Sequence, residues 1–255
     1  MRVPAREVPA AEPDWLTRRI RTLDIPTLGV RVAGMAPIRP PSRLLRALEG
    51  RALWEAAALL PALPLLATAP RGDGHTVLVL PGLGADDGST RILRRFLRDR
   101  GYDACGWRLG RNVGPTPEIL SGLGRRFAEV RDRQGGKVSL IGWSLGGVYA
   151  RGLARRFAPQ VRCVITLASP YNAPAIDDRA RNPLPVPTTS IYSRSDGIVP
   201  WRVCVEEPGP QRENVEVASS HIGMGHHPAT LLVIANRLAQ PEGRWRPYSP
   251  SGRVG

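Results

Sequence analysis

The sequence lacks any long hydrophobic run. No segment offers the roughly 18 consecutive apolar residues that a membrane-spanning helix requires. We therefore expect a soluble protein. The first residues also lack the apolar stretch of a secretory signal, because Pro4, Pro9, Pro13 and several charges interrupt them. No export signal is indicated.

Cysteine is scarce. The 255 residues contain only Cys105, Cys163 and Cys204. An odd number of widely separated cysteines indicates neither a disulfide framework nor the paired spacing of a zinc site. We expect no metal and no cofactor. We also expect a cytoplasmic protein, since free thiols suit a reducing compartment.

Lysine is almost absent, although the chain is strongly basic. Lys137 is the single lysine among 36 basic residues, and the net charge is +14. Such a charge attracts polyanions. However, arginine accompanies abundant alanine, glycine and proline, a composition that a GC-rich coding sequence produces by itself. The arginines are dispersed over expected helices, and no nucleic-acid-binding motif accompanies them. We expect no nucleic-acid partner.

The first 70 residues (1–70) differ in composition from the rest and predict an N-terminal extension. The beginning is rich in proline and arginine and shows helical spacing only over Asp14–Leu23. Apolar residues then recur at helical intervals behind Ser42, a residue type that caps helices, until Pro61 and Pro64 break the pattern. We expect an arm and a helical segment whose apolar residues are covered by the main domain. A membrane-surface anchor is the alternative, which the mixed charges of its polar face disfavour.

From residue 71 to 255, apolar runs alternate with segments of helical spacing. The runs are rich in β-branched residues, as in strands buried on both faces. The predicted strands are His75–Leu80, Tyr102–Trp107, Val138–Ile141, Val161–Leu167, Thr188–Tyr192 and Val215–Val217. The predicted helices are Asp87–Asp99, 117–134, Leu145–Phe157 and Pro228–Leu238. This alternation predicts one α/β domain with a doubly wound, mostly parallel sheet and helices on both faces.

Residues 168–187 interrupt the alternation. They contain five prolines and little periodicity, and they follow a predicted strand. An insertion at this position is typical of a lid over the site, so we expect a lid here.

Ser144 lies in the most distinctive stretch of the chain, Lys137–Tyr149 (KVSLIGWSLGGVY). A serine hydroxyl becomes a nucleophile when a base takes its proton, and a sharp strand-to-helix turn presents it to base and substrate. Gly142 and Gly146 flank the serine, where a Cβ would collide with the crossing strand and helix. The short GxSxG pattern also arises by chance in glycine-rich proteins, so the surrounding motifs decide its meaning.

Asp196 and His221 follow two later predicted strands, so nucleophile, acid and base occur in an order that is typical of one hydrolase architecture. For the acid, Asp177 and Asp178 are less suitable because no strand precedes them.

Three other histidines compete with His221 for the role of base. His226 and His227 adjoin Pro228 at a helix start, where capping or solvent exposure accounts for them. His75 opens a strand remote from the chemistry, so we expect a structural role for it.

Four motifs together resemble the α/β-hydrolase superfamily and, within it, the bacterial lipases and esterases. They are VLPGLG after the first strand, GWSLGG, IYSRSDGIVP and SSHIGMG. The resemblance spans about residues 75–240 and does not cover the N-terminal arm. The first motif lacks both GxGxxG spacing and a P-loop lysine, which argues against a phosphate-binding loop. The family's frequent His-Gly pair is Pro81-Gly82 here, which keeps the backbone donor.

The resemblance implies a serine hydrolase that cleaves a small-molecule or lipid acyl ester. Ser144 would be the nucleophile, Asp196 and His221 would complete a triad, and the N–H groups of Leu83 and Leu145 would form the oxyanion hole. Thioesterase or acyltransferase chemistry uses the same triad and stays open. A binding protein on the same scaffold, or a membrane-peripheral protein, is the alternative from another class.

Overall fold

The computed structural model describes residues 39–174, 176 and 181–249, and every structural statement below concerns these residues. The helix predicted over Asp14–Leu23 lies outside them, as do Asp177 and Asp178.

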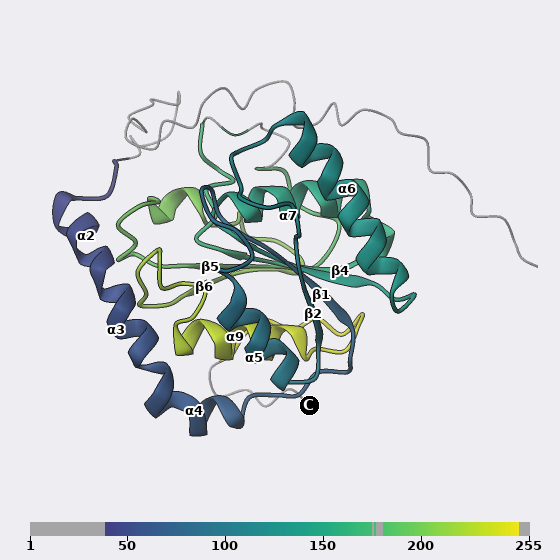
Figure 1. Ribbon diagram of the computed structural model, residues 1–255, viewed down its shortest axis with the longest axis horizontal. Coiled ribbons are helices and arrows are strands. Elements are labelled where there is room, and N and C mark those ends of the chain that lie inside the picture. Colours follow the sequence, from purple (N-terminus) through teal and green to yellow (C-terminus); the bar gives the residue numbers. More distant parts are fainter. Residues whose placement is uncertain (1–38, 175, 177–180, 250–255) are drawn as a thin grey trace, which may run out of the picture.

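Six strands form one sheet at the centre of the molecule (Figure 1). They are β1 (Thr76–Leu80), β2 (Asp103–Gly106), β3 (Val138–Trp143), β4 (Val161–Leu167), β5 (Thr188–Tyr192) and β6 (Arg212–Glu216). Their order is β2-β1-β3-β4-β5-β6, and each neighbouring pair is parallel. The predicted α/β class and parallel sheet are confirmed.

Strand β6 differs from its predicted range, Val215–Val217, because it begins at Arg212. It forms one edge of the sheet and pairs only with β5. Of its five residues only Val215 is buried. An edge strand needs no continuous apolar run, so the apolar pattern marks only part of it.

Helices cover both faces of the sheet (Figure 1). On one face lie α6 (Pro117–Asp132) and α7 (Leu145–Arg156), and on the other lie α5 (Arg91–Asp99) and α9 (Pro228–Leu238). Side chains of β1 alternate between the two cores, with Leu78 and Leu80 on the first face and Val77 and Val79 on the second. The doubly wound arrangement follows from this alternation.

Helix α5 begins at Arg91, four residues after the predicted start. The side chain of Asp87 accepts hydrogen bonds from the backbone N–H groups of Trp107, at 2.9 Å, and Arg108, at 3.0 Å. Asp87 therefore ties the loop before the helix to the end of β2 instead of opening the helix. Two aspartates favour such a turn because their side chains compete with helical hydrogen bonds.

The N-terminal segment forms short helices along the side of the molecule where β5 and β6 lie (Figure 1). They are α2 (Arg43–Ala47), the 3₁₀ turn η2 (Leu48–Arg51), α3 (Ala52–Ala57) and α4 (Leu59–Ala67). Ser42 caps α2 by accepting the Leu45 N–H at 3.2 Å, as predicted. Pro61 and Pro64 both lie inside α4, so the prediction that they break the helical pattern is wrong. Pro61 sits in the first turn, where a missing N–H costs nothing.

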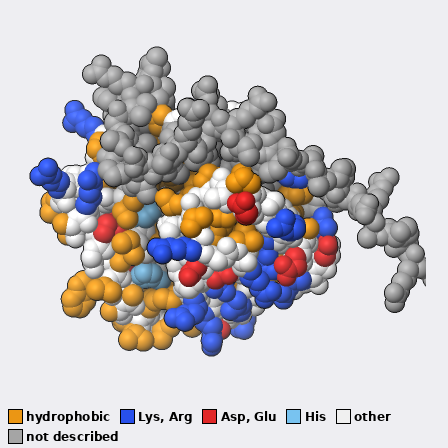
Figure 2. Space-filling view, turned by 45° about the horizontal axis from the view of Figure 1, so that its top comes forward, with side chains coloured by type: hydrophobic (Ala, Val, Ile, Leu, Met, Phe, Trp, Pro, Cys, Tyr) orange, Lys and Arg blue, Asp and Glu red, His pale blue; other side chains and the backbone are white. Residues whose placement is uncertain are grey.

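The prediction that the apolar residues of this segment are covered holds only for its end, where Leu66 is buried in the core and Leu59 packs against it. The other buried residues of the segment include Glu49, Ala52 and Glu55, whereas large apolar side chains face outward. Hydrophobic side chains accordingly gather on the surface at this end of the molecule (Figure 2). The exposed ones are Leu44, Leu48, Leu53, Trp54, Leu60, Leu63 and Leu65. No helix in the described part of the chain has the length and apolar character needed to cross a membrane.

The described beginning of the 168–187 insertion belongs to the core. Tyr171 is fully buried and its hydroxyl donates to the Cys204 carbonyl at 2.8 Å. The guanidinium of Arg151 lies 4.0 Å from the centre of this ring and forms a buried ion pair with Glu206. These contacts hold the start of the insertion in place. The lid stays a prediction for the rest of it.

Candidate active site

Ser144 sits on the turn between β3 and α7 with φ 53° and ψ −123°. A positive φ is unfavourable for a residue with a side chain and is typical of functional turns. The flanking glycines permit the turn, because a Cβ on Gly142 would overlap the Gly146 carbonyl, and one on Gly146 would overlap the carbonyls of Leu80 and Pro81. The predicted strand–turn–helix geometry is present.

We expect Gly146→Ala to lower the free energy of unfolding by about 1–3 kcal/mol or more, since overpacking against rigid backbone forces strain. Gly124→Ala is the matched control: Gly124 lies inside α6 with nothing within 4 Å of its added Cβ. It should raise stability by about 0.5–1 kcal/mol, because alanine favours helices. Urea unfolding of both variants checks this. Equal changes in the free energy of unfolding would show that the turn around Ser144 tolerates a side chain at Gly146.

The loop after β1 lies against the serine. A Cβ on Gly82 would stand 3.1 Å from the Ser144 Cβ. Of the two predicted oxyanion donors, Leu145 is the first residue of α7, where an N–H has no intrahelical acceptor. Leu83 N–H makes no hydrogen bond within residues 39–174, 176 and 181–249. Their role stays a prediction.

Asn112 supports this loop, and the sequence reasoning did not single it out. Its side chain is fully buried and donates to the Pro81 carbonyl at 3.0 Å. Its backbone carbonyl accepts from Gly84 N–H at 2.7 Å. The Tyr149 hydroxyl of α7 donates to the Asn112 side chain at 3.3 Å. The only sequence signal was its place in a glycine-rich loop.

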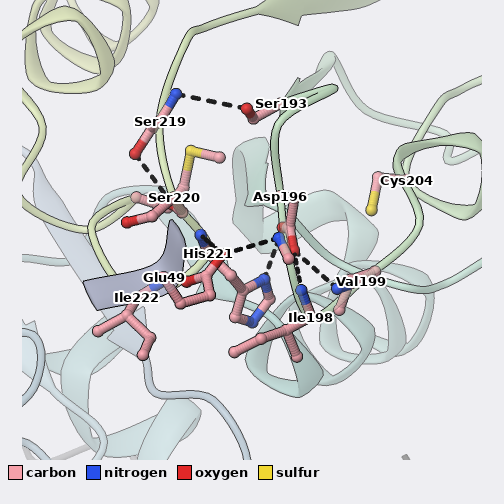
Figure 3. A network of polar contacts seen from close by, with 12 residues as sticks. Glu49, Ser193, Asp196, Ile198, Val199, Cys204, Ser219, Ser220, His221 and Ile222 are labelled. Carbon is pink, nitrogen blue, oxygen red and sulfur yellow. Dashed lines mark hydrogen bonds and ion pairs between the residues drawn. The ribbon is translucent and has the colours of Figure 1, made fainter. Parts of the chain in front are cut away.

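Asp196 and His221 meet at the carboxyl ends of β5 and β6 (Figure 3). The distance between His221 Nδ1 and Asp196 Oδ2 is 2.7 Å, and both residues are buried. The other carboxylate oxygen, Oδ1, accepts the N–H groups of Ile198 at 2.8 Å and Val199 at 2.7 Å. The carboxylate is therefore held by one oxygen and orients the imidazole with the other.

The histidine loop is attached to the strand that carries the serine. Trp143 Nε1 donates to the His221 carbonyl at 3.1 Å, and Trp143 immediately precedes Ser144. No hydrogen bond joins the Ser144 hydroxyl to the His221 ring among the described residues. Catalytic hydrogen bonds often tighten only when substrate binds, so the lack of this one does not argue against a triad.

The competing histidines have structural partners. His227 is the N-cap of α9, and its Nδ1 accepts Ala229 N–H at 3.3 Å, which confirms the capping interpretation. His226 Nε2 lies 3.1 Å from the Ala52 carbonyl of the extension.

A hydrogen-bonded Asp–His–Ser chain lies at the amino ends of the strands, away from Ser144. His75 lies between Asp73, with 2.5 Å to Oδ1, and Ser139, with 2.8 Å to Oγ. Burial lowers the pKa of His75, although the hydrogen bond to Asp73 acts to raise it. Ser139 is completely buried inside β3 and has no turn to present its hydroxyl. This chain ties the sheet together, which agrees with the expected structural role of His75.

Glu49 and Glu55 of the N-terminal segment also contact the Asp196 and His221 loops. Neither residue stands out in the sequence, because acidic residues in a helix are usually solvated. The described residues gather no group of three or more His, Cys, Asp or Glu side chains that would hold a metal ion.

No protein-family model matches the chain, and no curated protein matches it by sequence. Several solved structures match it in fold. Lipase B of Aspergillus fumigatus has a TM-score of 0.53 and 14% identity, over 84% of this chain and 61% of its own. The mature lipase BlEst2 of Bacillus licheniformis has a TM-score of 0.52 and 14% identity, over 68% of this chain and 95% of its own. A pyrethroid hydrolase from Sphingobium faniae has a TM-score of 0.51 and 18% identity, over 66% of this chain and 98% of its own. At these identities the likeness is one of fold.

Proposed function

Since the chain has the α/β-hydrolase fold, we propose that it is a serine hydrolase that cleaves carboxylic esters through an acyl-enzyme intermediate. The observation that carries the proposal is the buried pair of His221 and Asp196, which lies beside the turn of Ser144 at the carboxyl end of the sheet. Ligands of open parallel sheets bind at this end.

The proposed reaction starts when His221 takes the Ser144 proton as Oγ attacks the ester carbonyl. Asp196 holds the imidazole tautomer and stabilises the imidazolium that forms. The N–H groups of Leu83 and Leu145 bind the oxyanion of the tetrahedral intermediate.

His221 then returns the proton to the leaving alcohol, and an acyl–Ser144 ester remains. Water attacks this ester while His221 takes its proton, and the carboxylic acid leaves with Ser144 restored. The cycle uses one water for each ester cleaved and needs no cofactor.

A small-molecule or lipid acyl ester is the substrate class that we propose. The neighbours named above are described as lipases and as a pyrethroid hydrolase, which supports ester cleavage as the first reaction to test. Thioester hydrolysis and acyl transfer would proceed through the same acyl-enzyme and differ only in the leaving group and the acceptor.

The test has two steps. A fluorophosphonate probe should label the full chain, and peptide mass spectrometry should locate the label on Ser144. A series of p-nitrophenyl esters from acetate to palmitate, with an acyl thioester beside it, then defines the preferred acyl chain and leaving group. Absence of both labelling and turnover would overturn the proposal.

A further inference from the structure

We propose that the N-terminal helical segment is part of the active site. The Glu49 carboxylate, on η2, holds the Asp196 loop and the His221 loop at the spacing that the acid–base pair needs. Glu49 is thus a positioning residue. The inference rests on the proposed function, because the pair it positions is the one assigned to ester cleavage.

Glu49 accepts three backbone hydrogen bonds from the two loops (Figure 3). Its Oε1 accepts from Gly197 N–H at 2.7 Å and from His221 N–H at 2.9 Å, and its Oε2 accepts from Ile222 N–H at 3.0 Å. Gly197 directly follows Asp196. One buried carboxylate therefore bridges the residue after the acid, the base itself and the residue after the base.

Two hydrogen bonds join serines of one loop directly to serines of the other, and they are longer than those to Glu49. Ser195 Oγ donates to the Ser219 carbonyl, and Ser219 N–H donates to Ser193 Oγ, both at 3.3 Å. Hydrogen bonds to an ionised carboxylate are roughly twice as strong as neutral ones. We infer that Glu49 contributes more to the loop spacing than these serine contacts do.

Glu55 and Arg51 make a second attachment beside the first. Glu55 accepts the Ser220 N–H at 2.7 Å and the Ser220 hydroxyl at 2.6 Å. Arg51 donates to the Ser195 carbonyl at 2.9 Å and to its hydroxyl at 2.8 Å.

The Glu55 carboxylate is stabilised in its charged form. Burial acts to raise its pKa, but the hydrogen bonds from Ser220 and Arg51 outweigh burial and lower it. The Glu55 carboxylate is therefore charged at neutral pH, and its hydrogen bonds weaken only when the pH falls far enough to protonate it.

The loops are also shaped to fit the segment. A Cβ on Gly197 would overlap the Leu45 carbonyl, and a Cβ on Gly223 would overlap the Glu55 carboxylate. Both loops thus have a glycine at a position where the segment leaves no room for a side chain. This close packing accompanies the hydrogen bonds and points to the same arrangement.

Glu49→Gln tests the inference in the full-length protein. The amide keeps the shape but turns an N–H₂ group toward backbone N–H donors, so at least one of the three hydrogen bonds is lost. We expect kcat for a p-nitrophenyl ester, and the rate of fluorophosphonate labelling, to fall about 100-fold, since small misplacements of catalytic groups have effects of this size. KM should change by less than about twofold, because Glu49 does not line the acyl site in this proposal.

Glu213→Gln is the matched control. Glu213 on β6 accepts from Thr189 Oγ1 at 2.7 Å, Arg237 Nη1 at 2.9 Å and Tyr248 N–H at 2.5 Å, and it contacts neither triad loop through them. Its loss should lower the melting temperature and leave kcat unchanged. A Glu49→Gln protein that stays folded by circular dichroism with the kcat of the unchanged protein would overturn the inference.

Hydrogen exchange at the Gly197, His221 and Ile222 amides gives a readout that needs no activity. Exchange should be at least about tenfold faster in Glu49→Gln. If the unchanged protein neither labels nor turns over esters, the proposed function fails, and unchanged exchange at these amides would separately overturn the positioning role.

Should Glu49→Gln fail to fold, Arg51→Met tests whether the segment positions the pair, because the Arg51 side chain is partly exposed, at 26%, and makes the second attachment. A fall in kcat of about tenfold supports the inference, and an unchanged kcat with unchanged exchange overturns it.

Discussion

Ser144→Ala should abolish fluorophosphonate labelling and lower ester turnover by about 10⁴- to 10⁶-fold, because the hydroxyl supplies the covalent bond to the acyl group. The fold should persist, since the change removes one oxygen from a half-buried position. Labelling with the probe, peptide mass spectrometry and circular dichroism check the three parts of this expectation.

Ser139→Ala is the control for Ser144→Ala, because Ser139 belongs to the continuous hydrogen-bonded chain of Asp73, His75 and Ser139. Its hydroxyl is completely buried in β3, out of reach of a probe. Ser139→Ala should therefore label at the rate of the unchanged protein. If this variant lost labelling while Ser144→Ala kept it, the active site would have to be assigned to the other end of the sheet.

His221→Ala should be nearly inactive, while His227→Ala keeps most of its turnover. Only His221 has the Asp196 carboxylate at its Nδ1, whereas His227 caps α9. Loss of a triad base typically costs about 10⁴-fold or more in kcat. Steady-state kinetics on one short ester compare the two, and comparable losses would reopen the assignment of the base.

The pH profile of the unchanged protein belongs to the same test. Turnover should fall as the pH is lowered, because a protonated imidazole accepts no proton from Ser144. A profile that is flat across the acid and neutral range would contradict a histidine base.

The sheet and the proposed triad were accessible from the sequence because their signals are local. Strands buried on both faces read as continuous apolar runs, and the ranges predicted for β4 and β5 match the structure. The turn that carries Ser144 has Gly142 and Gly146 two residues away on either side. Topology then places the ends of parallel strands at one edge, which is why Asp196 and His221 meet there.

The orientation of the N-terminal segment could not be predicted from the sequence in this way. Periodicity assigns the apolar side to the core, yet Leu53 and Trp54 are exposed, at 79% and 78%, while Glu49 and Glu55 are buried. What attracts these carboxylates is a set of backbone N–H groups on loops that are remote in sequence. Backbone donors produce no pattern of side chains in the sequence, so contacts with main-chain atoms could not be predicted from it.

The contact between Glu49 and His221 joins residues 172 positions apart in the chain. Contacts of such long range form late in folding, because a large loop must close before they contribute. At a synthesis rate of about 5–20 residues per second, His221 is added to the chain roughly 10 to 30 s after Glu49. A nascent chain that stops before residue 221 would carry the serine turn and the acid loop without a base. The proposed acid–base pair would thus assemble only after the loop that follows β6 has been made, later than the serine turn and the acid loop.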